Sequence, residues 1–307
     1  MTVHHSCSLD DLIEAYKQHN RRARGLRDRT IKGYERLVRL FVRASLGDDP
    51  IDATRLSPAD VLRFVNSMRS RFSARSMKIV RTALRSFFLF LRMKGLCDRR
   101  LEAAIPNVAH WRLSTLPRCL NDQQLEQLLV SFDASTPCAY RDRAIVSCLS
   151  TLGLRPGEVA TLQLEDIDWR SGTIRLRTRK TGRGAILPLP REAGRAIVDY
   201  LRQERPNTEE RRVFVQHLGS RSGAPISSGV VSAAVVRVLR RAGINSPLAG
   251  GYVFRHTLAS RLVRRGASLK EVADLLGHRC LDTTTIYAKL DVTSLREVAL
   301  PWPEVTP

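Results

Sequence analysis

The chain has 307 residues, 43% of them hydrophobic, which is long enough for two domains that each bury a core. Lysine and arginine total 51 against 30 acidic residues, and the net charge of +21 favours a nucleic-acid partner, with a ribosomal-type or membrane-surface protein as the alternatives. The six cysteines form no Cys-x-x-Cys pair, and no apolar run approaches the ~20 residues of a membrane helix. We therefore exclude a zinc ribbon, a disulfide framework and a membrane protein, and we expect a soluble protein of the cytoplasm.

The first hundred residues predict four helices. Ser8 and Asp11 together resemble a capping box, and Ser57 followed by Pro58 marks a later helix start. Two of the helices show long apolar stripes at helical spacing. These stripes consist of Ile31, Tyr34, Leu37, Val38, Phe41 and Val42, and of Met77, Val80, Leu84, Phe87, Phe88 and Leu91. We therefore expect a helical domain over residues 1–105.

The other faces of the fourth helix are basic. They carry Arg75, Lys78, Arg81, Arg85 and Arg92. Such a run is usually only a solvated face, but charges of one sign repel each other unless an anion lies nearby. The pattern therefore favours a helix that contacts nucleic acid.

Residues 106–117 show no sustained periodicity and are predicted to be an interdomain linker. Beyond it, Asn121 with Gln124 marks a helix start, and a buried helix is expected to end at Gly153. The alternating segments GTIRLRT and RGAILPLP predict a β-hairpin. Further helices are expected near residues 190–204, 227–241, 252–265 and 268–276. Residues 118–307 should therefore form a mainly helical domain with a small sheet.

Four segments of this second domain carry residues suited to phosphodiester chemistry. They hold Arg155 and Glu158 in GLRPGEV, Lys180 between Arg179 and Arg183 in the hairpin, Tyr252 and Arg255 in YVFRHTLASRL, and His278 and Tyr287 in LLGHRCLDTTTIY. In order and spacing these segments resemble the catalytic domain of the tyrosine recombinases, the phage integrase family. The resemblance covers about residues 115–290, and the basic helical front resembles the core-binding domain of that family.

The resemblance implies a fold and an activity. The expected fold is mainly α with a small β-sheet: an N-terminal helical core-binding (SAM-like) domain and a C-terminal mixed α/β catalytic domain. The family cuts and rejoins specific DNA sites through a 3′-phosphotyrosine bond and exchanges strands through a Holliday junction. We therefore expect a site-specific recombinase for integration, excision or transposition of a mobile element. No cofactor is expected, because the chain has neither a Gly-Lys-Ser/Thr phosphate loop nor a carboxylate cluster suited to Mg²⁺.

The implied roles follow from the charge of a phosphodiester. Arg155 and Arg255 would grip its non-bridging oxygens through paired guanidinium donors. His278 would add a donor or orient the attacking group. Tyr287 would be the nucleophile, and because a phenol has a pKa of about 10 it needs cationic surroundings. Lys180 would protonate the departing 5′ oxygen.

Each role has a structural alternative. The alternatives are a charge at a helix C-terminus for Arg155, a plain phosphate anchor for Lys180, a helix cap for His278, and a core aromatic for Tyr287. Glu158 is interpreted as structural, either holding Arg155 or starting a helix.

One position departs from the family pattern, which has histidine three residues before the second arginine. Tyr252 occupies it here, and a phenol is a weaker base than an imidazole. His256 could substitute, but as the neighbour of Arg255 on a helix it should point about 100° away. We therefore interpret His256 as structural and Tyr252 as a wall of the site.

Other functions stay open on the sequence alone. The first is a DNA-binding protein of the same fold with impaired catalysis, which the change at Tyr252 would signal. The second is a topoisomerase that relaxes DNA without choosing a site, and the third is a helical RNA-binding protein.

The expected partners are double-stranded DNA with a recombination site, further copies of the chain, and accessory recombinases. The chain would act as a dimer on one site and as a tetramer in the synapse. Contacts with DNA are expected from Arg75, Lys78, Arg81, Arg85, Arg179 and Arg183. The apolar tail, residues 293–307, is predicted to dock onto a neighbouring protomer, with packing on its own domain as the alternative.

Overall fold

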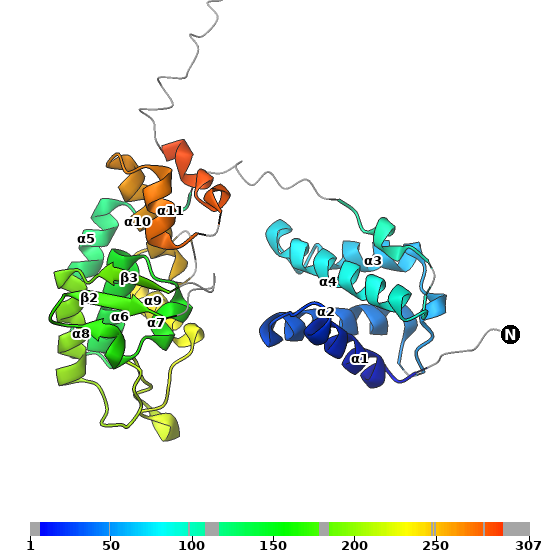
Figure 1. The fold of residues 1–307 in the computed structure, drawn as a ribbon, viewed down its shortest axis with the longest axis horizontal. Helices are drawn as coiled ribbons and strands as arrows, with labels where there is room; N and C mark the ends of the chain where they lie inside the picture. The colour runs from blue at the N-terminus through cyan, green and yellow to red at the C-terminus, as the bar shows by residue number, and fades with distance from the viewer. Residues whose placement is uncertain are drawn as a thin grey trace, which may run out of the picture. The chain divides into compact units, whose positions relative to one another are not determined.

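The computed structural model describes residues 7–48, 50–97, 99–107, 117–177, 184–246, 248, 250–278 and 280–290, without the side chains of residues 74, 75, 129 and 281. The chain divides into two compact units, residues 1–111 and 112–307. The described residues form helices and a single three-stranded sheet, which confirms the predicted fold class (Figure 1). None of the helices in these ranges combines the length and apolar character needed to cross a membrane.

The N-terminal unit is a bundle of helices, two of which start at the predicted caps, Ser8 and Ser57. Its elements are α1 (Leu9–Arg22), α2 (Asp28–Leu46), α3 (Pro58–Met68) and α4 (Ala74–Met93), with short 3₁₀ helices η1 (Ala53–Arg55) and η2 (Leu101–Ala104). The Ser8 hydroxyl accepts from the Asp11 amide at 3.1 Å, and Ser57 forms a complete capping box with Asp60. The side-chain caps satisfy amides that the first helical turn leaves unpaired.

Both predicted apolar stripes are buried in the core of this unit. The Phe41 ring lies edge-on to Phe64 and Phe88, with centroids 5.3 and 5.4 Å away. Leu101 and Ile105 belong to the same core, so the helical unit continues beyond α4 through η2. Aromatic packing of this density holds α2, α3 and α4 together.

The C-terminal unit is built around the buried helix α6 (Ala139–Leu152), which contacts α7, α8, α9 and α10. The other helices are α5 (Asp122–Val130), α7 (Pro156–Thr161), α8 (Arg191–Gln203), α9 (Ser228–Arg241), α10 (Tyr252–Arg264) and α11 (Leu269–Leu276). Short 3₁₀ helices are η3 (Leu164–Asp166), η4 (Gly219–Arg221), η5 (Leu281–Thr283) and η6 (Thr285–Leu290). Helices α10 and α11, orange in Figure 1, lie together at one end of this unit.

The sheet contains the predicted hairpin and one additional short strand. It has the order β1 (Ile167–Asp168), β2 (Thr173–Leu176), β3 (Ala185–Pro188), with all pairs antiparallel. Ile174 lies opposite Leu187, and both side chains are buried. The hairpin loop, residues 178–183, lies outside the described residues and includes Arg179, Lys180 and Arg183.

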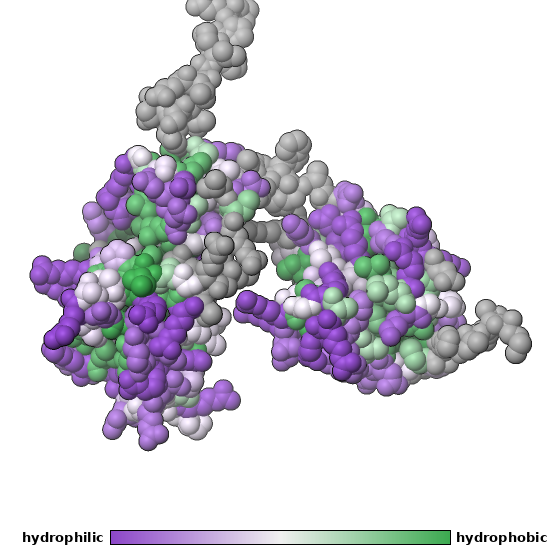
Figure 2. All heavy atoms as spheres, in the orientation of Figure 1, coloured by the Kyte–Doolittle hydropathy of each residue, from purple (hydrophilic) through white to green (hydrophobic). Residues whose placement is uncertain are grey.

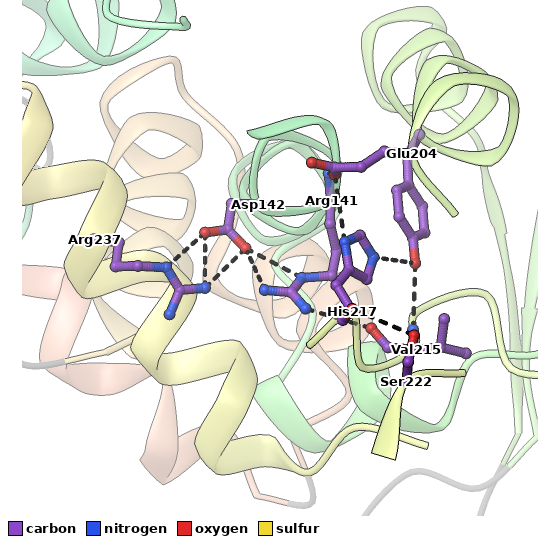
Figure 3. Close-up of polar contacts among 8 residues, drawn as sticks. Arg141, Asp142, Glu204, Val215, His217, Ser222 and Arg237 are labelled. Carbon is purple, nitrogen blue, oxygen red and sulfur yellow. Dashed lines mark hydrogen bonds and ion pairs between the residues drawn. The ribbon is translucent and has the colours of Figure 1, made fainter. Parts of the chain in front are cut away.

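A buried ionic network ties α6 to its neighbours (Figure 3). Asp142 is fully buried and lies between two guanidiniums, those of Arg141 on the same helix and Arg237 on α9. Arg237 bonds both carboxylate oxygens, with Nε to Oδ2 at 2.9 Å and Nη2 to Oδ1 at 3.0 Å. The paired charges offset part of the cost of burying each one. At the surface, by contrast, hydrophilic side chains cover much of the viewed face of each unit (Figure 2).

Candidate active site

The guanidiniums of the two predicted phosphate-binding arginines bond carbonyls at the C-terminal ends of α6 and α11. Arg255 donates from Nη1 to the Gly153 carbonyl at 2.7 Å, and from Nη2 to the Leu276 carbonyl. Arg155 donates from Nη2 to the Gly277 carbonyl at 3.2 Å. Because Leu276 and Gly277 are consecutive, the two guanidiniums meet at one turn of the chain.

The ends of α6 and α11 create these acceptors. Both helices end in a left-handed glycine, Gly153 with φ 61° and Gly277 with φ 60°. Carbonyls in a last helical turn have no partner within the helix, and the negative end of the dipole attracts cations. A β-carbon on Gly153 would lie 2.8 Å from a Leu276 methyl and 2.9 Å from a Leu258 methyl, so this approach requires glycine.

Glu158 holds Arg155 in two ways. Its Oε1 accepts from Arg155 Nη1 at 2.7 Å, and its Oε2 accepts from the Arg155 backbone amide at 2.8 Å. The second bond is half of a capping box that starts α7. Both halves of the structural interpretation of Glu158, anchoring the arginine and starting a helix, agree with these contacts.

Tyr287 lies on η6 and is 2% exposed. Its ring packs in a cluster with Ala259 and Val263 of α10 and with Val272 and Leu276 of α11. Burial raises the pKa of the Tyr287 phenol to about 12, and the positive charge of Arg255 opposes that rise. The phenol is therefore protonated at neutral pH in this arrangement.

His278 follows directly after the turn that binds both arginines. Its amide donates to the Ala273 carbonyl at 2.9 Å, and its Nδ1 lies 2.8 Å from the Thr284 hydroxyl. Thr284 is fully buried between η5 and η6. These contacts connect the end of α11 with the segment that carries Tyr287.

His256 makes the contact that the sequence interpretation missed. Its Nδ1 lies 2.8 Å from the Tyr287 hydroxyl, with the two rings tilted by 51° and their centroids 5.8 Å apart. His256 is expected to be structural because it should point about 100° from Arg255, but that direction leads to Tyr287, since η6 packs against α10. The signal was the spacing of His256, Ala259 and Val263, which share one helical face.

Comparisons with known proteins show the family of this chain. The pattern described as "Phage integrase family" matches residues 118–293, and "Phage integrase, N-terminal SAM-like domain" matches residues 13–95. A putative integrase/recombinase of Sinorhizobium fredii, y4rA, is 46% identical over 98% of this chain and 73% of its own length. The chain belongs to the phage integrase family.

One further relative supports this family membership, and one solved structure has a similar fold. Tyrosine recombinase XerD of Listeria monocytogenes is 31% identical over 94% of this chain and 97% of its own length. The structure of a lambda integrase dimer bound to a core site has a TM-score of 0.69 and 20% identity, covering 98% of this chain and all of that one. The prediction of a tyrosine-type site-specific recombinase is confirmed at this level.

Tyr252, where the family usually has histidine, is the first residue of α10 and is 51% exposed. It therefore lies at the solvent-facing start of the helix that carries Arg255 and His256. No group of three or more His, Cys, Asp or Glu residues is arranged to hold a metal within the described ranges.

The predicted DNA contacts on α4 separate into exposed and buried positions. Lys78 and Arg85 are exposed, and Arg85 donates to the Asn107 side chain at 2.8 Å. Arg81 is only 8% exposed, and its nearest described acceptor is the Pro106 carbonyl at 3.4 Å. Arg81 is thus covered by the residues that follow η2, and this burial does not favour Arg81 as a contact to DNA phosphate. The Arg75 side chain lies outside the described residues, as do Arg179, Lys180, Arg183 and the tail, residues 293–307.

Proposed function

We propose that this chain cuts and rejoins duplex DNA at a specific site through a 3′-phosphotyrosine bond to Tyr287. The observation that carries the proposal is the convergence of Arg155 and Arg255 on the consecutive carbonyls of Leu276 and Gly277. Two permanently charged, planar donor groups at one turn suit a phosphate that gains charge during attack.

The proposed cleavage step uses the residues around that turn. Arg155 and Arg255 hold the non-bridging oxygens, and His278 adds a donor from the residue that follows Gly277. The Tyr287 oxygen bonds to phosphorus as the bond to the 5′ oxygen breaks, and Lys180 protonates that oxygen. Because the phosphotyrosine keeps the energy of the broken bond, religation is the reverse reaction and needs no cofactor.

The buried position of Tyr287 adds a requirement. Because Tyr287 is 2% exposed, a phosphate of duplex DNA can reach its hydroxyl only after residues that cover it move aside. We propose that DNA binding supplies this movement, because a phosphate at the arginines would compete for donors that now bond helix-end carbonyls.

The proposed partner is duplex DNA carrying a recombination site, bound by both units. Lys78 and Arg85 of α4 contribute phosphate contacts, as do Arg75, Arg179 and Arg183. Two copies would bind one site and four would form the synapse, in which strands are exchanged through a Holliday junction. The net charge of +21 supports a polyanionic partner, and the lambda integrase of similar fold is bound to DNA as a dimer.

A nicked oligonucleotide carrying the natural site tests the proposal, because the short fragment diffuses away and traps the covalent complex. We expect a protein–DNA adduct that resists denaturing electrophoresis, and no adduct with Tyr287→Phe. Tyr140→Phe is the matched control, because Tyr140 packs against Phe132 outside the site. Binding without an adduct would instead support a catalytically impaired DNA-binding protein. Relaxation of arbitrary supercoiled plasmids would support a topoisomerase.

A further inference from the structure

The contact between His256 and Tyr287 points to a role that the sequence pattern does not assign. We infer that His256 accepts the hydroxyl proton of Tyr287 during cleavage and returns it during religation. The inference rests on the proposed function of Tyr287 as the nucleophile. It gives this chain a proton acceptor even though Tyr252 occupies the position where the family usually has histidine.

The geometry meets the requirement for a general base. The His256 Nδ1 lies 2.8 Å from the Tyr287 oxygen, within the hydrogen-bond reach that proton transfer needs. A neutral imidazole that carries its proton on Nε2 presents Nδ1 as an acceptor toward the phenol. His256 lies one residue after Arg255 on α10, so the same helix brings the base and the phosphate-binding guanidinium to the site.

Burial makes such a base necessary. The phenol that attacks must lose its proton, and Tyr287 is 2% exposed in the apolar cluster with Ala259 and Val263. Solvent water is therefore a poor acceptor in this arrangement. Since burial raises the pKa of Tyr287 to about 12, very little phenolate forms on its own at neutral pH.

Among the contacts that the structure describes, His256 is the acceptor within hydrogen-bond distance of the Tyr287 hydroxyl. Arg255 lowers the pKa of Tyr287 by its charge, but a guanidinium has no lone pair for a proton. Cys119 makes no hydrogen bond to Tyr287 among the described contacts. The described partner of His278 Nδ1 is Thr284. Tyr252 is half exposed at the start of α10 and is a weaker base than an imidazole.

Atoms and charges balance in the proposed step. The O–H bond of Tyr287 breaks, its proton moves to His256 Nδ1, and the Tyr287 oxygen bonds to phosphorus. The bond from phosphorus to the 5′ oxygen breaks, and that oxygen takes a proton from the general acid, proposed to be Lys180. On religation the 5′ hydroxyl attacks the phosphotyrosine and gives its proton back to the general acid, proposed to be Lys180, while the bond from phosphorus to the Tyr287 oxygen breaks and that oxygen takes the proton back from His256.

Single-turnover cleavage of the nicked site by the full chain, measured between pH 5.5 and 9.5, tests the inference. His256→Asn puts an amide oxygen near the position of Nδ1, so it keeps an acceptor for the phenol without a base. We expect it to bind the site normally but to cleave about 10²- to 10⁴-fold more slowly at pH 7. Its residual rate should rise about tenfold per pH unit, because only the phenolate now reacts. The wild-type rate should instead level off at neutral pH and fall in acid.

A purely positioning role predicts a different pattern. His256→Asn would then cleave at close to the wild-type rate with the wild-type pH profile, and only His256→Ala would be slow. That result overturns the inference while leaving the adduct, and therefore the proposed function, intact. If the wild type itself forms no adduct through Tyr287, the proposed function fails first.

A second measurement does not depend on the histidine variants folding. Tyr287→Phe should bind the site without cleaving it, and nitrogen-15 NMR of that complex gives the titration midpoint of His256. The inference requires this midpoint to match the acid limb of the wild-type rate. A separation of more than about one pH unit overturns it, because another group would then control the rate.

Discussion

The C-terminal unit contains two arginine centres that differ in what accepts their hydrogen bonds. Arg141 and Arg237 both bond the carboxylate of Asp142, which joins α6 to α9 (Figure 3). Arg155 and Arg255 meet at the carbonyls of a helix end; Arg155 also pairs with Glu158, whereas Arg255 donates to the backbone carbonyls of Gly153 and Leu276. A carboxylate neutralises the charge it binds, whereas a carbonyl orients a guanidinium without neutralising it.

The Asp142 network is therefore suited to stabilising the fold, and the Leu276–Gly277 turn is suited to binding a ligand. In the Asp142 network the charges compensate each other, so the main effect of the network is to fix the position of α9 against α6. At the Leu276–Gly277 turn the bonds are individually weaker, and a phosphate can compete for them. We call the Asp142 network with Arg141 and Arg237 the first centre, and the turn that binds Arg155 and Arg255 the second centre. Substitutions at the first centre should change stability, and substitutions at the second should change the rate of DNA cleavage.

The largest expected effect is on stability, from Asp142→Asn. An amide cannot neutralise the two guanidiniums that now share the buried carboxylate, so the free energy of unfolding should fall by about 3–5 kcal/mol. Urea unfolding followed by circular dichroism measures this. The protein that remains folded should still form the DNA adduct. A loss below about 1 kcal/mol would show that the network does not hold the helices.

Arg255→Lys should mainly change cleavage. A lysine cannot donate to the Gly153 and Leu276 carbonyls in the paired geometry of a guanidinium or grip two phosphate oxygens at once. We expect adduct formation to slow by about 10²- to 10³-fold. Arg237→Lys is the matched control, because it weakens the Asp142 network on α9 and should lower stability without changing the cleavage rate of folded protein. Equal loss of cleavage in both variants would contradict the distinction between an arginine centre that stabilises the fold and one that binds phosphate.

His217, which lies near Arg141 of the first centre, should make stability depend on pH. Burial lowers the pKa of His217 to about 4, with the charge of Arg141 acting in the same direction. The unfolded chain takes up this proton near pH 6.5, whereas the folded chain stays neutral until about pH 4. Stability should therefore fall as the pH drops from 6.5 to 4, by about 3 kcal/mol in total.

Urea unfolding at several pH values measures this loss, and His217→Gln should reduce it. The groups that face His217 are Tyr200, whose hydroxyl lies 3.2 Å from Nε2, and Glu204, 3.9 Å from Nδ1. The charged Arg141 acts on it as well. An equal acid loss in the variant would assign the pH dependence to other groups.

The smallest expected effect is the loss of stability on replacing glycine with alanine, compared at two glycines of the same backbone conformation. Gly153 and Gly172 both have φ 61°, but only a β-carbon at Gly153 would collide with neighbours, the methyls of Leu258 and Leu276. Gly172→Ala should cost only backbone strain, about 1 kcal/mol. Gly153→Ala should cost about 1–2 kcal/mol more, and it should slow cleavage by displacing the carbonyl that binds Arg255. Thermal unfolding and adduct formation together measure both effects.

Much of the fold follows from local patterns in the sequence. The caps at Ser8, Ser57 and Asn121 start helices as predicted, and the apolar stripes of α2 and α4 are buried. The hairpin of β2 and β3 also follows from alternation. β1, with only two residues, and α7, with six, are too short to give a periodic signal.

Part of the candidate site could likewise be predicted from the sequence, and part could not. The residue types in four segments, and the spacing between them, are enough to single out Arg155, Arg255, His278 and Tyr287. Local sequence did not reveal that Arg81 is buried under the Pro106 carbonyl, because that depends on where the chain runs after η2.

The sequence by itself determined the helix starts at Ser8, Ser57 and Asn121, the end of α6 at Gly153 and the family, because each depends on residues within a few positions of one another or on a long ordered set of motifs. Only the tertiary structure decided that two arginines distant in the sequence meet at one turn and that His256 touches Tyr287. Those contacts depend on how α6, α10, α11 and η6 pack. Packing is set by the summed shape of many side chains, and no short stretch of sequence contains it.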